Sequence, residues 1–326
     1  MARPEILRPI PAVVGPTASG KTALSLALGA RLGAEIISCD SMQIYRRMDI
    51  GTAKPSAAER AALPHHLLDI REIGEPYSAA DYAADAADAV KDIEARGKVP
   101  LFCGGTGLYL AAARRGSGTA EDVPGETPLR GALLARANTQ EGARALWEEL
   151  QTVDPPSAAA THPNNLRRVI RALEIFYATG TPKSEWDCRT RETPPALPMV
   201  LFFLDWEREA LYRRIDQRVD EMLAVGLMEE VRALFDEGLL SPGSTAGQAI
   251  GYKEFAACLR GEMSLSDATL ALKTATRRYA KRQLTWFARE TDRIRIAAQH
   301  ADGTPRSPDE LAEEILSYLP ALSSRP

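Results

Sequence analysis

The sequence predicts an α/β fold: a parallel sheet of the phosphate-loop type flanked by helices, with an all-helical insertion domain. Three features predict it. A glycine-rich loop, Gly15–Thr22, stands between an apolar run and a helical pattern. Short apolar runs then alternate with helical stretches in the first part of the chain, as in a parallel sheet covered by helices. Helical patterns alone dominate from Leu129 to Thr179.

The first part of the chain contains four runs that we expect to be strands, each followed by a turn or loop. They are Ile10–Val14, Ala34–Ser38, His66–Ile70 and Val99–Cys103. Helices are expected over Thr22–Leu32 and over the alanine-rich stretch Tyr77–Arg96.

Ligands of such sheets bind beyond the carboxyl ends of the strands. The segments that follow three of these strands are therefore the candidate site. They are Gly15–Thr22, Asp40–Gln43 and Gly104–Tyr109.

A change of composition near Gly116 marks a domain boundary. Residues 116–128 are rich in Gly, Thr and acidic side chains and predict a linker or mobile loop. The turn Gly180-Thr181-Pro182 ends the helical patterns, and a proline-punctuated stretch follows up to Pro198. We therefore divide the chain into a core of residues 1–115 and 196–326 and a helical insertion of residues 116–195.

The last part of the chain returns to the core. Met199–Leu204 predicts a fully buried strand, and Asp205 is expected to cap the helix that follows. Helical patterns cover Glu207–Glu237 and Leu265–Glu290, with a loop at Gly238–Gly247 between them. Arg293–Ala297 predicts a last short strand.

Composition narrows the class of protein. The chain has 326 residues, a formal net charge of −4 and four scattered cysteines without a C-x-x-C pair. Global charge therefore gives no sign of nucleic-acid binding, and the cysteines predict reduced thiols in a cytoplasmic protein, not a disulfide framework or a zinc site. No apolar run is long enough to span a bilayer, and residues 1–8 lack a secretory signal.

The loop Gly15–Thr22 reads Gly-Pro-Thr-Ala-Ser-Gly-Lys-Thr and fits G-x-x-x-x-G-K-[ST] at every constrained position. Gly15 and Gly20 let backbone N–H groups turn inward around a phosphate, Lys21 adds a positive charge, and Thr22 offers a hydroxyl to Mg²⁺. The start of the next helix adds its positive dipole end. The alternative is an ordinary glycine-rich turn, but the flanking strand and helix favour a phosphate or diphosphate site.

Two further loops have open interpretations. Asp40 follows a strand, so its carboxylate could accept a proton or orient Mg²⁺, or it could equally cap a helix. In Gly104–Tyr109 the glycines allow close approach to a ligand that Thr106 could bind, but a structural turn would also use them. Arg218 could reach a diphosphate or pair with a neighbouring carboxylate. Lys54 is a possible second phosphate contact.

Two basic clusters stand out from the acidic average. Arg167–Arg171 lies in the insertion, and Arg277–Gln283 lies near the end of the chain, where Trp286 and Phe287 follow. Cations beside aromatic rings suit a nucleic-acid backbone and unstacked bases. A solvated helix face is the alternative for each cluster.

Taken in order, these segments resemble the tRNA dimethylallyltransferase (tRNA isopentenyltransferase) family. The motifs that carry the resemblance are GPTASGKT, DSMQIYRRMDIGTAKP, GGTGLYL, HPNNLRRVIRALEI, GYKEF and TRRYAKRQLTWF. The resemblance covers about Ala12–Trp286. It implies transfer of a dimethylallyl group from its diphosphate to N6 of adenosine 37 in the anticodon loop of a tRNA, with Mg²⁺ and without nucleotide hydrolysis.

The resemblance also implies roles for particular residues. Asp40 would be the general base, Thr106 would contact the substrates at the reaction channel, and Arg218 would bind the diphosphate. Eight loop residues would hold the donor diphosphate: Gly15, Pro16, Thr17, Ala18, Ser19, Gly20, Lys21 and Thr22, the last also placed for the metal. The implied tRNA contacts are Asp40, Ser41, Met42, Gln43, Thr106, Arg130, Arg167, Arg168, Val169, Ile170, Arg171, Arg277, Arg278, Lys281, Arg282 and Gln283.

Rival functions share part of this pattern. A phosphate-loop kinase of small molecules would have the same loop and sheet but would not need the arginine-rich C-terminal helix. A prenyltransferase of free adenine nucleotides would not need either basic segment, and a non-enzymatic RNA adaptor would tolerate loss of Asp40. The partners that the resemblance implies are the tRNA anticodon stem-loop and dimethylallyl diphosphate, and we expect a monomer that does not associate with membranes.

Overall fold

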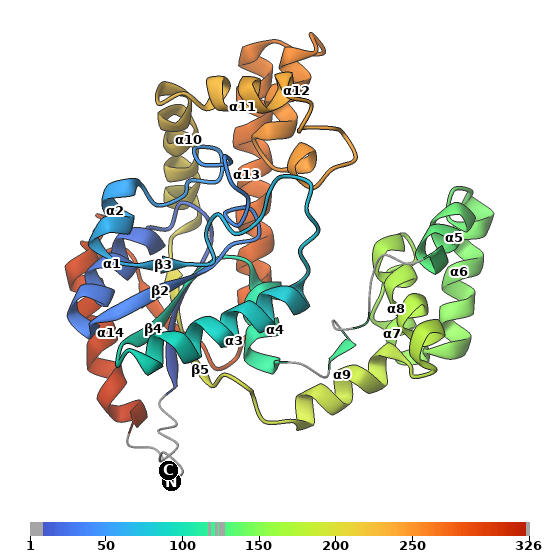
Figure 1. The fold of residues 1–326 in the computed structure, drawn as a ribbon, viewed down its shortest axis with the longest axis horizontal. Helices are drawn as coiled ribbons and strands as arrows, with labels where there is room; N and C mark the ends of the chain where they lie inside the picture. Colours follow the sequence, from blue (N-terminus) through green and yellow to red (C-terminus); the bar gives the residue numbers. More distant parts are fainter. Residues whose placement is uncertain (1–8, 117–118, 121–122, 124–127, 324–326) are drawn as a thin grey trace. The chain divides into compact units, whose positions relative to one another are not determined.

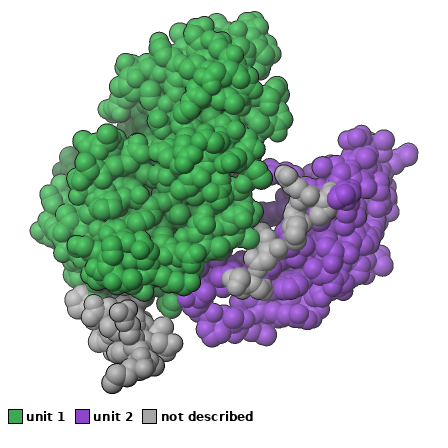
Figure 2. All heavy atoms as spheres, viewed as in Figure 1, with its two compact units in different colours: residues 1–111, 197–326 green, residues 112–196 purple. Residues whose placement is uncertain are grey.

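The computed structural model describes residues 9–116, 119–120, 123 and 128–323 (Figure 1). The chain forms two compact units, which are coloured separately in Figure 2. Unit 1 comprises residues 1–111 and 197–326, and unit 2 comprises residues 112–196. The sequence places the same division at residues 116 and 195.

Unit 1 is built on a six-stranded sheet in which every neighbouring pair is parallel. The strand order is β3-β2-β4-β1-β5-β6. The strands are β1 (Ile10–Val14), β2 (Ala34–Cys39), β3 (His65–His66), β4 (Val99–Gly104), β5 (Met199–Asp205) and β6 (Ile294–Ala297). All residues of β1 and β2 are buried, which explains the continuous apolar sequence of β1 and the apolar residues that predominate in β2. β1 therefore lies inside the sheet between β4 and β5.

Helices cover this sheet and extend beyond it (Figure 1). They are α1 (Lys21–Leu32), α2 (Ala57–Ala62), α3 (Ala79–Ala95), α4 (Gly107–Arg115, which runs into unit 2), α10 (Arg208–Ala224), α11 (Leu227–Asp236), α12 (Tyr252–Leu259), α13 (Leu265–Phe287) and α14 (Pro308–Ser323). One apolar core joins the sheet to α1, α10 and α14. A second core joins the loop after β2 to α10, α11, α12 and α13.

In unit 2 the structure describes helices α5 (Pro128–Arg136), α6 (Gln140–Val153), α7 (Pro155–Ala159), α8 (Leu166–Thr179) and α9 (Lys183–Glu192). Asp154, which is fully buried, accepts hydrogen bonds from the backbone N–H groups of Ser157 and Ser184 at 3.2 and 3.0 Å. One carboxylate thus satisfies N–H groups at the starts of both α7 and α9.

The structure corrects several sequence expectations. β3 is only His65–His66, because Leu67 and Asp69 have left-handed φ angles of 61° and 55° that end the strand before Ile70. Gly226, with φ 107°, divides the stretch Glu207–Glu237 into α10 and α11.

The cap assigned to Asp205 was also wrong. Asp205 ends β5 and forms an ion pair with Arg295, whereas Glu207 caps α10 through the Ala210 N–H. Within the expected linker 116–128, residues 117–118, 121–122 and 124–127 lie outside the described residues. Ala120 and Val123 are buried against Ile175. In the part of the chain that the structure describes, no helix is both long and apolar enough to cross a membrane.

Candidate active site

The phosphate loop joins β1 to α1 and turns its backbone sharply. Gly15 and Gly20 have φ angles of 152° and 92°, and Ala18 adopts the left-handed region at 61°. Lys21 folds back over the loop, where its Nζ donates to the Pro16 carbonyl at 2.7 Å. The loop therefore has the inward-turned form that suits an anion.

Side chains far along the chain hold this loop from outside. Trp206 Nε1 donates to the Ser19 carbonyl, and Arg214 Nε donates to the Ala18 carbonyl, both at 2.9 Å. On the other side, the Thr17 N–H donates to Gln283 Oε1 at 2.8 Å. The bonds to the carbonyls of Ala18 and Ser19 hold the left-handed turn at Ala18 in place.

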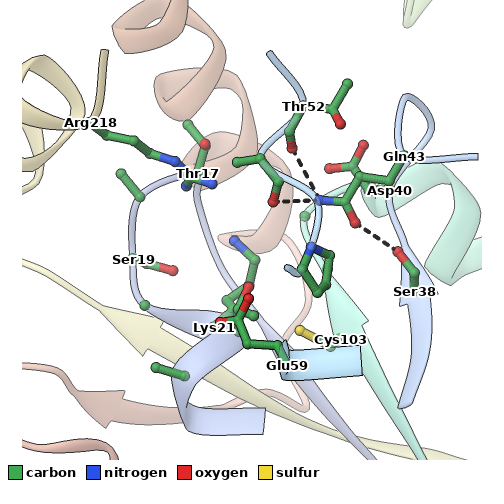
Figure 3. Close-up of a pocket in the computed structure, with 18 of the residues that line it drawn as sticks. Thr17, Ser19, Lys21, Ser38, Asp40, Gln43, Thr52, Glu59, Cys103 and Arg218 are labelled. Atoms are coloured by element: carbon green, nitrogen blue, oxygen red, sulfur yellow. Dashed lines mark hydrogen bonds between the residues drawn. The ribbon is translucent and has the colours of Figure 1, made fainter. Parts of the chain in front are cut away.

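The loop lines a pocket of about 370 Å³ (Figure 3). All of its walls belong to unit 1. They include phosphate-loop residues, the ends of β2 and β4, the loop after β2, α10 and α13. The polar lining residues are Thr17, Ser19, Lys21, Thr22, Ser38, Asp40, Gln43, Thr52, Glu59, His65, Cys103, Arg214, Gln217, Arg218, Glu221, Tyr279 and Gln283.

Three cations converge at the phosphate-loop end of this pocket. Burial lowers the pKa of Lys21 to about 8 and also lowers the pKa values of Arg214 and Arg218. Burying several positive charges close together disfavours their charged forms, which lowers their pKa values. A multivalent anion bound between them would raise these pKa values again. Arg218 lines the pocket together with Glu221, so both of its sequence interpretations, a diphosphate contact and a carboxylate partner, stay predictions.

Arg214 was missed by the sequence argument. It precedes Arg218 by four residues on α10, so both lie on one helix face. Its guanidinium carbon lies 4.4 Å from the centre of the Trp206 ring, which orients it toward the loop. The i,i+4 spacing from Arg218 was the signal available in the sequence.

Asp40 follows β2 and does not cap a helix. Its Oδ1 accepts the Met42 N–H at 2.9 Å, an arrangement that closes a turn, and residues 41–44 form a turn. The Ser41 N–H donates to Thr106 Oγ1 at 3.1 Å, while the Thr106 N–H donates to the Cys39 carbonyl at 3.1 Å. The Asp40 and Gly104–Tyr109 loops are therefore one structural unit, as their positions on neighbouring strands predict.

Gln43 lines the pocket beside Asp40. Its Nε2 donates to the carbonyls of Thr52 and Ala53 at 3.1 and 3.2 Å, and its Oε1 accepts from Ser38 Oγ (Figure 3). Lys54, by contrast, is 1% exposed, and its Nζ bonds to the carboxylates of Asp49 and Asp69. The phosphate contact expected of Lys54 is therefore corrected: this lysine anchors the loop and does not line the pocket.

The basic segment of α13 is divided between two faces. Arg278, Lys281 and Arg282 are exposed, whereas Arg277 forms a 2.9 Å ion pair with Asp216. Gln283 is buried at 5% exposure and lines the pocket, so only a nucleotide that enters the pocket could reach it, and the tRNA contact expected of it stays a prediction.

Tyr279, on α13, lines the pocket and was not singled out from the sequence. Burial raises its pKa, so its hydroxyl remains protonated near neutral pH. It lies one helical turn before Gln283, a spacing that could have identified both as inward-facing.

The basic segment of unit 2 is divided in the same way. Arg167 and Arg168 are exposed, but Val169 and Ile170 are buried in the helical core at 0% and 1% exposure. The tRNA contacts expected of these two apolar residues are therefore corrected, because side chains packed inside a core cannot touch an RNA.

Two other arginines of unit 2 contact one buried carboxylate. Arg171 and Arg130 approach Glu174, which is fully buried, at 2.9 and 3.2 Å. Arg171 also donates to the carbonyls of Ala120 and Val123. Arg171 thus has a structural role whether or not it also meets a ligand.

The described residues contain no group of three or more His, Cys, Asp or Glu side chains that could hold a metal ion. Thr22 lies at the start of α1 and lines the pocket, where Asp40 provides a carboxylate in the same lining. This donor set suits an oxygen-preferring cation bound mainly through a ligand's phosphate groups.

Comparison with known proteins identifies the family. The family model described as IPP transferase matches residues 43–290. The tRNA dimethylallyltransferase of Geobacillus thermodenitrificans (strain NG80-2) is 49% identical over 310 residues, which cover 94% of this chain and 95% of that protein. The tRNA dimethylallyltransferase of Geobacillus kaustophilus (strain HTA426) is 50% identical over 275 residues, which cover 84% and 86%.

Solved structures agree. The full-length tRNA isopentenylpyrophosphate transferase from Bacillus halodurans is 41% identical, with a TM-score of 0.67 and coverage of 97% of this chain and 98% of that one. A eukaryotic dimethylallyltransferase acting on tRNA is 29% identical, with a TM-score of 0.80 and coverage of 95% and 80%. Given matches of this extent in both sequence and structure, the chain belongs to the IPP transferase family.

Proposed function

We propose that this protein transfers the dimethylallyl group of dimethylallyl diphosphate to N6 of adenosine 37 in the anticodon loop of tRNAs. The observation that carries the proposal is a single pocket in which a phosphate loop with three cations faces the carboxylate of Asp40. Membership of the IPP transferase family and close relatives named tRNA dimethylallyltransferases support the same reaction.

The donor binds at the phosphate-loop end. Residues 15–22 surround the diphosphate, those from Ala18 to Thr22 with backbone N–H groups, and Lys21, Arg214 and Arg218 offset its negative charge. The Thr22 hydroxyl, together with the donor's own oxygens, would hold Mg²⁺, which would add to the neutralisation of the leaving diphosphate. The five-carbon group then points away from the loop, toward Asp40.

Transfer is a substitution at the donor's first carbon. The lone pair of the adenine amino nitrogen forms the new C–N bond while the C–O bond breaks, and the bonding electrons leave with the diphosphate. The N–H proton passes to the Asp40 carboxylate, whose Oδ1 is already oriented by the Met42 N–H. The cations stabilise charge that develops on the leaving oxygen.

Asp40 also lies close enough to the cations to influence them. Its negative charge raises the pKa values of Lys21 and Arg218, opposing the larger effect of burial. The two ends of the pocket are thus electrostatically linked.

The RNA binds through exposed basic residues. Arg278, Lys281 and Arg282 on α13, together with Arg167 and Arg168 on α8, contact phosphates and position the anticodon stem-loop. Arg130 adds a contact from α5. The target adenine leaves its stack to reach the pocket, where Gln43 lines the wall beside Asp40. Ser41, Met42 and Thr106 support that wall through their hydrogen bonds. The protein acts as a monomer in the cytoplasm, where free cysteines such as Cys39 and Cys103 remain reduced.

The proposal is tested by supplying radiolabelled dimethylallyl diphosphate with one of three acceptors: unmodified tRNA, the same tRNA with guanosine at position 37, or AMP. Label should enter the first acceptor alone. Label in AMP would identify a prenyltransferase of free nucleotides. A parallel reaction contains ATP in place of the donor; phosphate release there, with no label transferred in the first assay, would identify a kinase or nucleotidase instead.

A further inference from the structure

Gln283 is a buried polar side chain, and both the oxygen and the nitrogen of its amide form hydrogen bonds. Its Oε1 accepts the Thr17 N–H of the phosphate loop at 2.8 Å, and its Nε2 donates to the Gly105 carbonyl at 2.9 Å. Thr17 and Gly105 lie 266 and 178 positions away in the sequence. One side chain of α13 therefore joins the two loops that frame the pocket.

Helix α13 packs tightly against the loop that contains Gly105 and Gly107. A Cβ atom on Gly105 would lie 2.2 Å from Gln283 Nε2, and one on Gly107 would lie 2.2 Å from Trp286 Cδ2. Ala280 and Phe287, on either side of Gln283 along α13, are 0% and 1% exposed. Closely packed surfaces transmit displacement instead of absorbing it, so a shift of α13 must move residues 105–107 as well.

The same loop extends the connection to the proposed base. Thr106 Oγ1 accepts the Ser41 N–H, and the Thr106 N–H donates to the Cys39 carbonyl, so the backbone on both sides of Asp40 is tied to it. Through Gln283 and this loop, α13 contacts both the donor end and the acceptor end of the pocket.

We propose that Gln283 is a positioning residue that sets the shape of the phosphate loop and couples donor binding to RNA binding on the outer face of α13. Arg278, Lys281 and Arg282 are exposed on that helix. An RNA that binds them fixes α13, and Gln283 transmits the constraint to Thr17. This inference rests on the proposed function, because it takes tRNA as the ligand of the exposed cations.

The chemistry of the side chain explains why glutamine suits this position. It presents one acceptor and one donor in a single plane, which match one N–H and one carbonyl. Methionine has similar length but makes neither bond, so it would leave the Thr17 N–H without its acceptor. Glutamate keeps the acceptor for Thr17 but loses the donor to Gly105.

The test measures binding without turnover, using inorganic diphosphate and an anticodon stem-loop RNA. Calorimetry gives the affinity for diphosphate with and without RNA, and the affinity for RNA with and without diphosphate. We expect RNA to tighten diphosphate binding by about fivefold or more, and diphosphate to tighten RNA binding by the same factor, as linkage requires.

Gln283→Met should weaken diphosphate binding about tenfold, leave RNA binding alone unchanged and reduce the coupling factor to about one. Gln283→Glu should restore coupling, although its charge weakens diphosphate binding with and without RNA. The matched control is Gln299→Met, since Gln299 also accepts one backbone N–H, from Glu207, and donates to one carbonyl, of Gly303, but lies outside the pocket lining. This control should keep the wild-type coupling.

Two results would overturn the inference: a wild-type coupling factor of one, or unchanged coupling in Gln283→Met. Circular dichroism tests whether Gln283→Met is folded. If it is not folded, Gln283→Asn replaces it with the same expected result, because the asparagine amide is one methylene too short to reach both loops. Failure of the proposed function is distinguishable, because wild-type protein would then transfer no label to tRNA at all.

Discussion

The two ends of the pocket are built in different ways. The donor end combines the backbone of one continuous loop with Lys21, Arg214 and Arg218, so several groups share the stabilisation of one anion. The acceptor end relies on one carboxylate, Asp40, held by a turn and by Thr106. Redundancy at one end and dependence on a single group at the other predict unequal sensitivity to substitution.

The largest effect is expected at the acceptor end. Asp40→Asn preserves the size and the Met42 contact but removes the proton acceptor, so the single-turnover rate of transfer should fall about 10³-fold. Binding of inorganic diphosphate should be unchanged or tighter, because a negative charge beside Lys21 and Arg218 is lost. A rate within threefold of wild type would refute the assignment of the base.

A smaller loss is expected at the donor end. Arg218→Leu should lower kcat about 100-fold, because one stabilising cation disappears while Lys21 and Arg214 remain. The control is Arg213→Leu on the exposed face of the same helix, which should stay near wild type. If Arg218→Leu reduced transfer as much as Asp40→Asn does, the proposed redundancy would be wrong.

Substitutions of the exposed arginines of α13 should affect tRNA binding and leave diphosphate binding unchanged. Arg278→Ala combined with Arg282→Ala should weaken tRNA binding on the order of thirtyfold, about 1 kcal/mol for each lost contact. The slope of log affinity against log salt concentration should become shallower by about 1.5. Diphosphate binding without RNA should not change, and an unaltered salt slope would remove this helix from the interface.

The smallest predicted effect is a pH dependence of the donor end. Burial lowers the pKa of Lys21 to about 8, and the anion prefers the protonated lysine. Affinity for dimethylallyl diphosphate should therefore be highest below pH 8 and fall up to about tenfold as the pH rises to about 9. Lys21→Met should bind weakly at every pH and show no such decline; a decline that persists in this variant would assign the titration to another group.

Sequence alone predicted the parts of the site that local patterns encode. The phosphate loop, the strand before it and the helix after it lie within residues 10–32 and carry their own signals. The neighbouring ends of β2 and β4 followed from the alternation of strands and helices, which placed Asp40 and Thr106 at one edge of the sheet. The N-terminal capping chemistry after β5 was misassigned by two residues, because both Asp205 and Glu207 can accept backbone hydrogen bonds.

The remaining parts depend on contacts between distant segments. The amide of Gln283 faces inward because α13 packs on the phosphate loop, and a run of Arg, Lys and Gln does not reveal which face of the helix is covered. Lys54 resembled a phosphate ligand until Asp49 and Asp69 were found around it. Val169 and Ile170 share a segment with exposed arginines, but helical periodicity turns them into the core.

The bond between Thr17 and Gln283 joins residues 266 positions apart, so it has a consequence for biosynthesis. A ribosome adds the phosphate-loop motif before Gln283, which separates them by tens of seconds at elongation rates of about 5–20 residues per second. A nascent chain therefore carries the motif long before it can hold the finished loop.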